Sequence, residues 1–240
     1  MADGDLQIDT RVTSTLHPQI VRSLPEYADE TNRHLLANTE AALELSYKAI
    51  AQIHDAREHA EKDPTMNEAA RAIAVADFAD KLQERATKAV DSAYGVLTKQ
   101  IAQLEGELSQ PVQSHAANSS ISKEIRDHVR GLKADGKSAM SFVRERLNEG
   151  DLSSASAVLG APAYLSGLTN EQQVALLKLY HSKASPQKVR QLAALKAGVG
   201  VLERGGGLIL GQVQKAIGAD YRKIKMLREA NNASKRAFNV

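Results

Sequence analysis

The chain has 240 residues, of which 25% are charged and 42% are hydrophobic, and it contains no cysteine and no tryptophan. Without cysteine it can form no disulfide, thiolate zinc site or iron–sulfur cluster, and it has no cysteine nucleophile. The net charge of +2 conceals an uneven distribution, because the first 110 residues carry −8 and the last 60 carry +9. The two ends should therefore contact different partners, or the acidic end of one copy could meet the basic end of another.

Residues 1–30 contain Pro18, Pro25 and scattered small and acidic residues without a helical period. This composition predicts an extended arm that becomes ordered, if at all, against a neighbour. The amino terminus has no leader pattern of basic and then apolar residues. An uncharged stretch at 205–214 is only ten residues long, which is too short to cross a bilayer.

Two long helices are predicted between residues 31 and 109. Helix-forming residues dominate 31–62, and apolar side chains recur there on one face. This helix should end at Asp63-Pro64, because proline cannot continue it, and the capping box Thr65-x-x-Glu68 should open the next one. Since no proline follows until Pro111, residues 66–109 can form one helix of about 66 Å. The two helices are expected to form a long antiparallel hairpin.

The second half of the longer helix carries a heptad pattern of apolar residues, which is typical of a coiled-coil seam. A second apolar stripe earlier in the helix, which includes Phe78 and Leu82, gives it two faces to cover. The sequence leaves open whether the seam packs within one chain, as in a helical bundle, or against another copy in an oligomer. The seam residues are Val90, Tyr94, Leu97, Ile101, Leu104 and Leu108.

Shorter helices are predicted after a linker rich in Pro, Ser, Asn and Gln. Periodicity and capping signals predict them near 121–132, 138–149, 151–159, 169–180 and 185–204. Gly205 to Gly207 are expected to form a hinge before a short amphipathic helix and a final basic helix capped by Asp220. No alternating strand pattern of useful length occurs, so the predicted fold class is all-α.

The expected domain organisation has four parts. They are an extended arm (1–30), a coiled-coil-like hairpin (31–115), a domain of shorter helices (116–204) and a glycine-hinged pair of basic helices (205–240).

One segment formally matches the phosphate-binding loop G-x-x-x-x-G-K-[ST], through Gly131, Gly136, Lys137 and Ser138. In such a loop Lys137 would bind the β and γ phosphates and Ser138 would bind magnesium. The motif requires a preceding buried strand, whereas residues 123–130 have the pattern of a charged amphipathic helix. Nucleotide binding is therefore a minor alternative to a simpler interpretation, in which one helix ends at Gly136 and Ser138 caps the next.

The same region superficially looks like the start of a helix–turn–helix unit. The helix that would then enter the DNA groove, at 151–159, contains no arginine, lysine, asparagine or glutamine to read base edges. It is therefore a poor recognition helix.

The basic carboxyl end is the strongest candidate for contact with a partner. Between residues 215 and 236 seven basic residues are opposed only by Asp220 and Glu229. Such a cluster could follow nucleic-acid phosphates or meet an acidic protein surface. The candidate contact residues are Lys215, Arg222, Lys223, Lys225, Arg228, Lys235 and Arg236.

The residues His54, Asp55, Glu58 and His59 form the one local cluster of metal-ligand types. On a helix its two histidines point about 140° apart, so no metal site is predicted. No nucleophile elbow and no distinctive carboxylate pair occurs in the sequence. The sequence therefore predicts neither a cofactor nor an enzymatic activity.

Together these features predict a non-enzymatic structural or assembly protein that forms oligomers by helical packing and docks on a partner through its basic carboxyl end. The layout of long helices, acidic arm and basic terminal helices resembles that of scaffolding or internal virion proteins of tailed bacteriophages. The resemblance covers layout and composition, and it implies that the basic end binds a coat or portal protein. The expected location is the cytoplasm, or the virion if the protein comes from a phage. A nucleic-acid-binding protein that uses residues 205–240 is the alternative.

Overall fold

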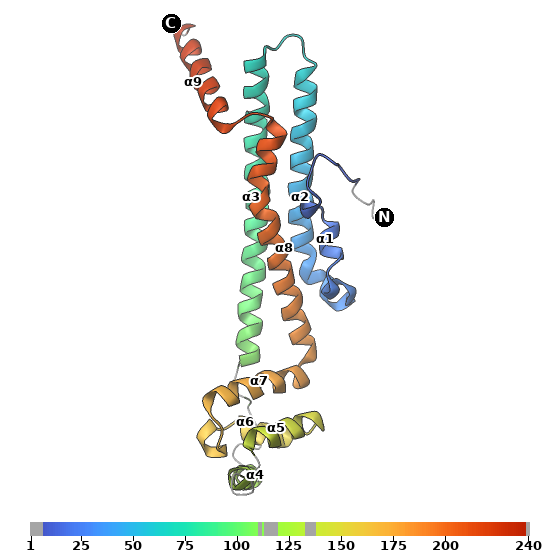
Figure 1. Ribbon diagram of the computed structural model, residues 1–240, viewed down its shortest axis with the longest axis vertical. Helices are drawn as coiled ribbons and strands as arrows, with labels where there is room; N and C mark the ends of the chain where they lie inside the picture. The colour runs from blue at the N-terminus through green and yellow to red at the C-terminus, as the bar shows by residue number, and fades with distance from the viewer. Residues whose placement is uncertain (1–6, 110–111, 113–119, 133–137, 239–240) are drawn as a thin grey trace. The chain divides into compact units, whose positions relative to one another are not determined.

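The computed structural model describes residues 7–109, 112, 120–132 and 138–238, and these residues form helices and connecting turns without a strand (Figure 1). The all-α prediction is confirmed. The chain forms two compact units, a long-helix unit of residues 1–99 and 194–240 and a short-helix unit of residues 100–193. Two helices, α3 (Glu68–Ser109) and α8 (Pro186–Ile217), contribute residues to both units.

This division differs from the expected domain boundaries. Residues 194–204, which were expected in the domain of shorter helices, belong to the long-helix unit. The expected boundary between residues 115 and 116 lies outside the described residues. The difference arises because α8 does not end near Arg204 but continues to Ile217, and its second half packs on α2 (Glu30–Glu61) and α3.

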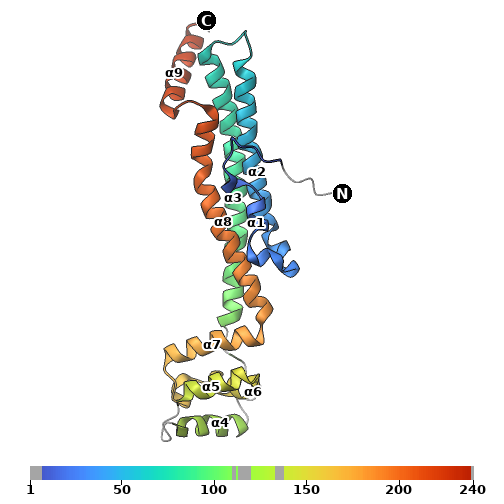
Figure 2. The ribbon, with the colours of Figure 1, turned by 45° about the vertical axis from the view of Figure 1, so that its right-hand side comes forward.

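In the long-helix unit α2, α3 and α8 lie side by side (Figures 1 and 2). The bounds of α2 and α3 agree with the predicted 31–62 and 66–109 to within two residues. The side chain of Asp29 accepts a hydrogen bond from the Thr31 amide and so caps the start of α2. The core between these helices is aliphatic, and its fully buried side chains include Leu36, Leu43, Ile50, Leu97 and Leu202.

The helix α8 is continuous through Gly205, Gly206 and Gly207, so the predicted glycine hinge is wrong. Three of its glycines, Gly198, Gly205 and Gly206, instead permit close packing. A Cβ atom on Gly198 would lie 2.8 Å from Leu97 Cδ2 and 3.0 Å from Leu36 Cδ2. A Cβ atom on Gly205, seven residues later, would lie 2.9 Å from Leu43 Cδ2. Both glycines therefore face the core, where only hydrogen fits between the helices.

The predicted heptad seam is divided by the structure. Val90 and Leu97 are buried and pack against α8, since a Cβ on Gly206 would lie 3.2 Å from Val90 Cγ1. Tyr94 is 39% exposed, and its hydroxyl lies 3.5 Å from Glu203 Oε1. The remaining seam residues are half-buried and belong to the short-helix unit; they are Ile101, Leu104 and Leu108.

The expected extended arm is wrong for its described part, residues 7–30. This segment forms two 3-10 helices, η1 (Ser14–Leu16) and η2 (Pro25–Ala28), and a short helix α1 (Gln19–Arg22), all of which contact α2. Leu16 and Val21 are fully buried. The apolar side chains of the segment thus find their neighbour within the same chain, on the face of α2.

The short-helix unit packs around α6 (Leu152–Leu159), in which every side chain from Ala155 to Leu159 is buried. Helix α6 contacts α4 (Ser120–Gly131), α5 (Ala139–Asn148), α7 (Asn170–Ala184) and a 3-10 helix, η4 (Ala163–Ser166). The predicted capping box of Thr169 and Gln172 is present at the start of α7. The side chains of α6 from Ala155 to Leu159 are therefore not available to read a DNA groove.

We predict that Gly198→Ala lowers the free energy of unfolding by about 1–2 kcal/mol, because the added methyl group meets three side chains of the buried core. Gly207→Ala is the matched control. A Cβ at Gly207 would have no neighbour within 4 Å, so this change should raise stability by about 0.5–1 kcal/mol through helix propensity. Urea unfolding of both variants measures the difference. Equal stabilisation by both changes would contradict the close-packing role of Gly198.

Candidate partner interface

The basic helix α9 (Tyr221–Phe238) begins after a tight turn that ends α8. Gly218 has a φ of +72°, a conformation that favours glycine, and its amide donates to the Gln214 carbonyl at 3.1 Å. The guanidinium of Arg57 from α2 lies against Gly218, in the space that a side chain would fill. As predicted, Asp220 caps α9, because its carboxylate accepts a hydrogen bond of 2.9 Å from the Arg222 amide.

One face of α9 docks on the amino-terminal half of α3 (Figures 1 and 2). Arg228 Nη2 lies 2.7 Å from Asp77 Oδ1 and 2.7 Å from Asp80 Oδ2, and Lys223 Nζ lies 3.1 Å from Glu68 Oε1. Ile224, between these two basic residues, is only 3% exposed. We call Lys223, Ile224 and Arg228 the inner face of α9.

The electrostatics of Arg228 reflect opposing effects. Burial alone would lower the pKa of Arg228, but the hydrogen bonds to Asp80 and Asp77 raise it above its usual value. Its Nε atom is buried and makes no hydrogen bond. Both carboxylates are more than half exposed, so solvent and salt screen these ion pairs.

The opposite side of α9 faces solvent. By the 100° step of an α-helix, Arg222 and Met226 lie across the helix from Ile224, and Lys225 and Arg236 flank them. All four side chains are exposed, and Met226 is 69% exposed. We call Arg222, Lys225 and Arg236 the outer basic face. The last two predicted contact residues, Lys215 at the end of α8 and Lys235 on α9, are exposed as well.

The seven basic residues predicted to contact a partner therefore fall into two groups, which the sequence did not distinguish. Two of the seven, Lys223 and Arg228, bind acidic residues of the same chain. The 3–4 residue spacing of Ile224, Leu227 and Arg228 places them on one side of the helix. This spacing is the sequence signal that could have indicated that one side of α9 packs within the chain.

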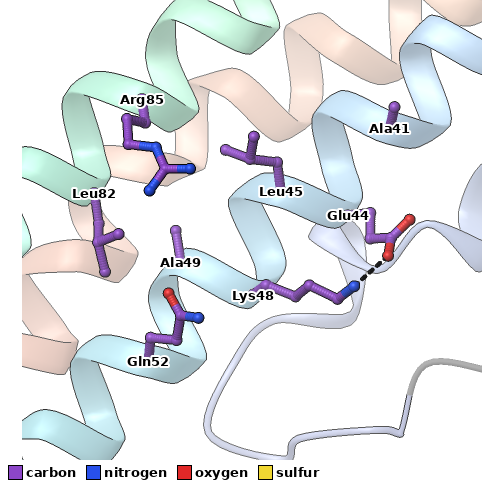
Figure 3. A pocket seen from close by; sticks show the side chains of 8 residues that line it. All are labelled: Ala41, Glu44, Leu45, Lys48, Ala49, Gln52, Leu82 and Arg85. Atoms are coloured by element: carbon purple, nitrogen blue, oxygen red, sulfur yellow. Dashed lines mark hydrogen bonds and ion pairs between the residues drawn. The ribbon is translucent and has the colours of Figure 1, made fainter.

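A shallow groove of about 310 Å³ lies between α2 and α3 (Figure 3). Arg85 reaches from α3 toward Leu45 and Ala49 of α2, and Lys48 forms an ion pair with Glu44 at the rim. The lining is a mixture of alanine, leucine and long polar side chains, and no nucleophile and base face each other in it. The groove has the character of a helix-packing surface.

The histidine and carboxylate cluster on α2 binds an arginine. Arg11 Nη2 lies 2.6 Å from Asp55 Oδ1, Arg11 Nη1 lies 2.6 Å from Glu58 Oε1, and Arg11 also binds its neighbour Asp9. These contacts hold the amino-terminal segment against α2, and the hydrogen bonds from Arg11 lower the pKa of Asp9. In the part of the chain that the structure describes, no group of three or more histidines, cysteines and carboxylates could hold a metal ion.

Part of the predicted phosphate-binding loop can be located. Gly131 is the last residue of α4, and Ser138 caps α5 through a reciprocal capping box with Ser141. Gly136 and Lys137 lie outside the described residues. The element before the motif is a helix and not the strand that a phosphate-binding loop needs.

A comparison with protein-family models, with curated protein sequences and with solved structures found no match to this chain. Among the described residues, no helix is both long enough and apolar enough to cross a membrane.

We predict that acidification from pH 7.5 to 5.5 lowers the free energy of unfolding less in His54→Gln than in the wild-type chain. Burial and the nearby Arg11 lower the pKa of His54 below 6.5, so the unfolded chain takes up its proton first as the pH falls. The stability that neutral His54 contributes is fully present above about pH 6.5. It is lost as the pH falls through the pKa that His54 has in the folded chain. Denaturant unfolding at both pH values measures it.

His59→Gln is the control for this prediction, since His59 is an exposed histidine on the same helix. It should keep the wild-type dependence on pH. If both variants kept that dependence, His54 would not be its source.

Proposed function

We propose that this chain is a non-enzymatic assembly protein that docks on an acidic surface of a protein partner through the outer basic face of α9. The observation that carries the proposal is the division of α9 into two faces. The inner face is occupied by α3, whereas Arg222, Lys225 and Arg236 are exposed. A positively charged face of this kind speeds the encounter with an acidic partner and fixes its orientation.

The composition of the outer face favours a protein partner. Met226, which lies across the helix from Ile224, exposes 69% of its surface, and apolar groups of this kind supply the buried centre of a protein interface. Glu229 lies on the same side of the helix, between Arg222 and Arg236 by the helical repeat. A carboxylate at that position would face the phosphates of a nucleic acid and repel them.

The resemblance of the layout to phage scaffolding and internal virion proteins suggests one kind of partner. On this proposal the acidic surface belongs to a coat or portal protein, and the chain is a virion component. Otherwise the partner is an acidic protein of the cytoplasm.

Nucleic-acid binding is the second candidate, and the net charge of +9 over the last 60 residues favours it. The two candidates differ in their dependence on salt. Affinity for nucleic acid should fall steeply as phosphate counterions are released, whereas a contact that also buries apolar side chains should persist at higher salt.

We predict that the triple variant Arg222→Glu, Lys225→Glu and Arg236→Glu binds a labelled polyglutamate chain at least about tenfold more weakly than the wild type. Fluorescence anisotropy at low salt measures the binding, with a DNA duplex of equal length as the comparison probe. The control is Lys62→Glu, Lys81→Glu and Lys99→Glu, which makes the same change of charge at exposed positions elsewhere.

An equal loss in the control variant would show that net charge, and not this face, binds the probe. Binding to DNA that is much tighter than to polyglutamate and falls steeply with salt would favour the nucleic-acid candidate.

Oligomerisation is the other part of the proposal. Because Val90 and Leu97 are buried within the chain, contact between copies would use the apolar side chains that remain exposed on α8. Leu210 is 59% exposed and Leu208 is 40% exposed, and both lie in the long-helix unit.

We predict that the full chain forms a defined multimer in light scattering and that Leu210→Glu shifts it toward the monomer, because a buried charge opposes an apolar contact. Thr87→Glu, at an exposed position of α3, should leave the mass unchanged. A monodisperse monomer for the wild-type chain at all concentrations would contradict the oligomer.

A further inference from the structure

We infer that α9 is a releasable latch, held on α3 by carboxylates that occupy the place of an acidic partner. Release would free the inner face and add it to the outer basic face. This inference deepens the proposed function and rests on it for its biological meaning, but the movement itself can be tested on the isolated chain.

The contact that holds α9 is small and largely ionic. From Tyr221 to Asn231 only Ile224 is buried, while Leu227, Arg228 and Asn231 are half-buried. By contrast, α8 contributes a series of buried side chains to the core from Ala194 to Ala216. With so little apolar burial, the ion pairs of Lys223 and Arg228 provide a large share of the attraction, and they are sensitive to salt.

The ion pairs can also be exchanged for those of a partner. One nitrogen of Arg228 binds two carboxylates, Asp77 and Asp80, that lie three residues apart on one side of α3. The Nε atom of the same guanidinium is buried without a hydrogen bond, so the docked position leaves part of its donor capacity unused. An acidic surface that satisfies all of these donors competes directly with α3.

The joint before α9 allows the helix to move as a unit. Residues 218–220 lie between two helices, and Gly218 is the residue with φ +72° at that point. The start of α9 is capped by Asp220, which belongs to the joint and not to α3. The helix can therefore detach without losing its amino-terminal cap.

Release changes the chemistry of α9. Ile224 and Leu227 would become exposed, and Lys223 and Arg228 would join Arg222, Lys225 and Arg236. The free helix would present an apolar strip bordered by basic side chains, which is a surface suited to docking in an acidic groove of a protein. The contact between α9 and α3 of the same chain thus keeps this apolar strip covered until an acidic partner competes with α3 for the basic residues of α9.

The experiment uses the absence of cysteine from the chain, which allows two spin labels to be attached at chosen sites. Thr87→Cys on α3 and Ala230→Cys on α9 are both exposed positions that leave the ion pairs intact. Double electron–electron resonance should give one narrow distance distribution at low salt. At about 0.5 M salt, or with excess polyglutamate, a second and longer population should appear.

Variants of the acidic residues test the cause of the docking. Asp77→Asn with Asp80→Asn should increase the longer-distance population about fivefold at low salt. Asp80→Asn alone should give a smaller increase. Asp91→Asn removes one charge at an exposed position of the same helix and should leave the distribution unchanged. Arg228→Gln tests the same contact from α9 if the double variant is poorly folded.

A single narrow distribution under all conditions and in all variants would overturn the latch. Loss of the short distance on dilution with unlabelled chain would overturn it too, because α9 would then dock on a second copy. If the latch opens but the outer-face variant still binds polyglutamate like the wild type, the movement stands and the proposed function fails. If the outer face binds polyglutamate but α9 never moves, the proposed function stands and the latch fails.

Discussion

The close approach of α8 to α2 and α3 is the constraint on which the long-helix unit depends. At Gly198 and Gly205 a hydrogen atom occupies the space where any side chain would meet buried leucines. This contact buries Leu36, Leu43 and Leu97 in one aliphatic core and fixes the course of α8 along α2 and α3 up to its end at Ile217. Because α9 starts only a few residues after that end, the packing of α8 also brings the basic helix to the acidic part of α3.

Part of the charge asymmetry of the chain is neutralised by ion pairs within it. Acidic residues of α3 bind Lys223 and Arg228, and acidic residues of α2 bind Arg11. These exposed or half-exposed pairs each add little stability, but they orient the segments that carry them. The charge that is left over on the outer basic face is therefore a better guide to function than the total for the last 60 residues.

The proposed role in assembly follows from this division of α9. A helix with one face docked by a small ionic contact and another face exposed and basic can bind a partner in two stages. The outer face would make the first encounter, and the inner face would follow if the partner displaces Asp77 and Asp80.

The positions of most helices could be predicted from the sequence because their signals are local. Asp63-Pro64 separates α2 from α3, and Thr169 with Gln172 opens α7, through contacts within a few residues. The role of the glycines could not be predicted in this way, since a glycine run can either interrupt a helix or let it pack closely, and the neighbouring helices decide which. The partners of Arg11 lie 44 and 47 residues away, and Asp80 lies 148 residues from Arg228. The sequence alone therefore determined where most of the helices form and which ends are charged. Only the tertiary structure decided which charges meet and which remain exposed, because those contacts join segments far apart in the chain.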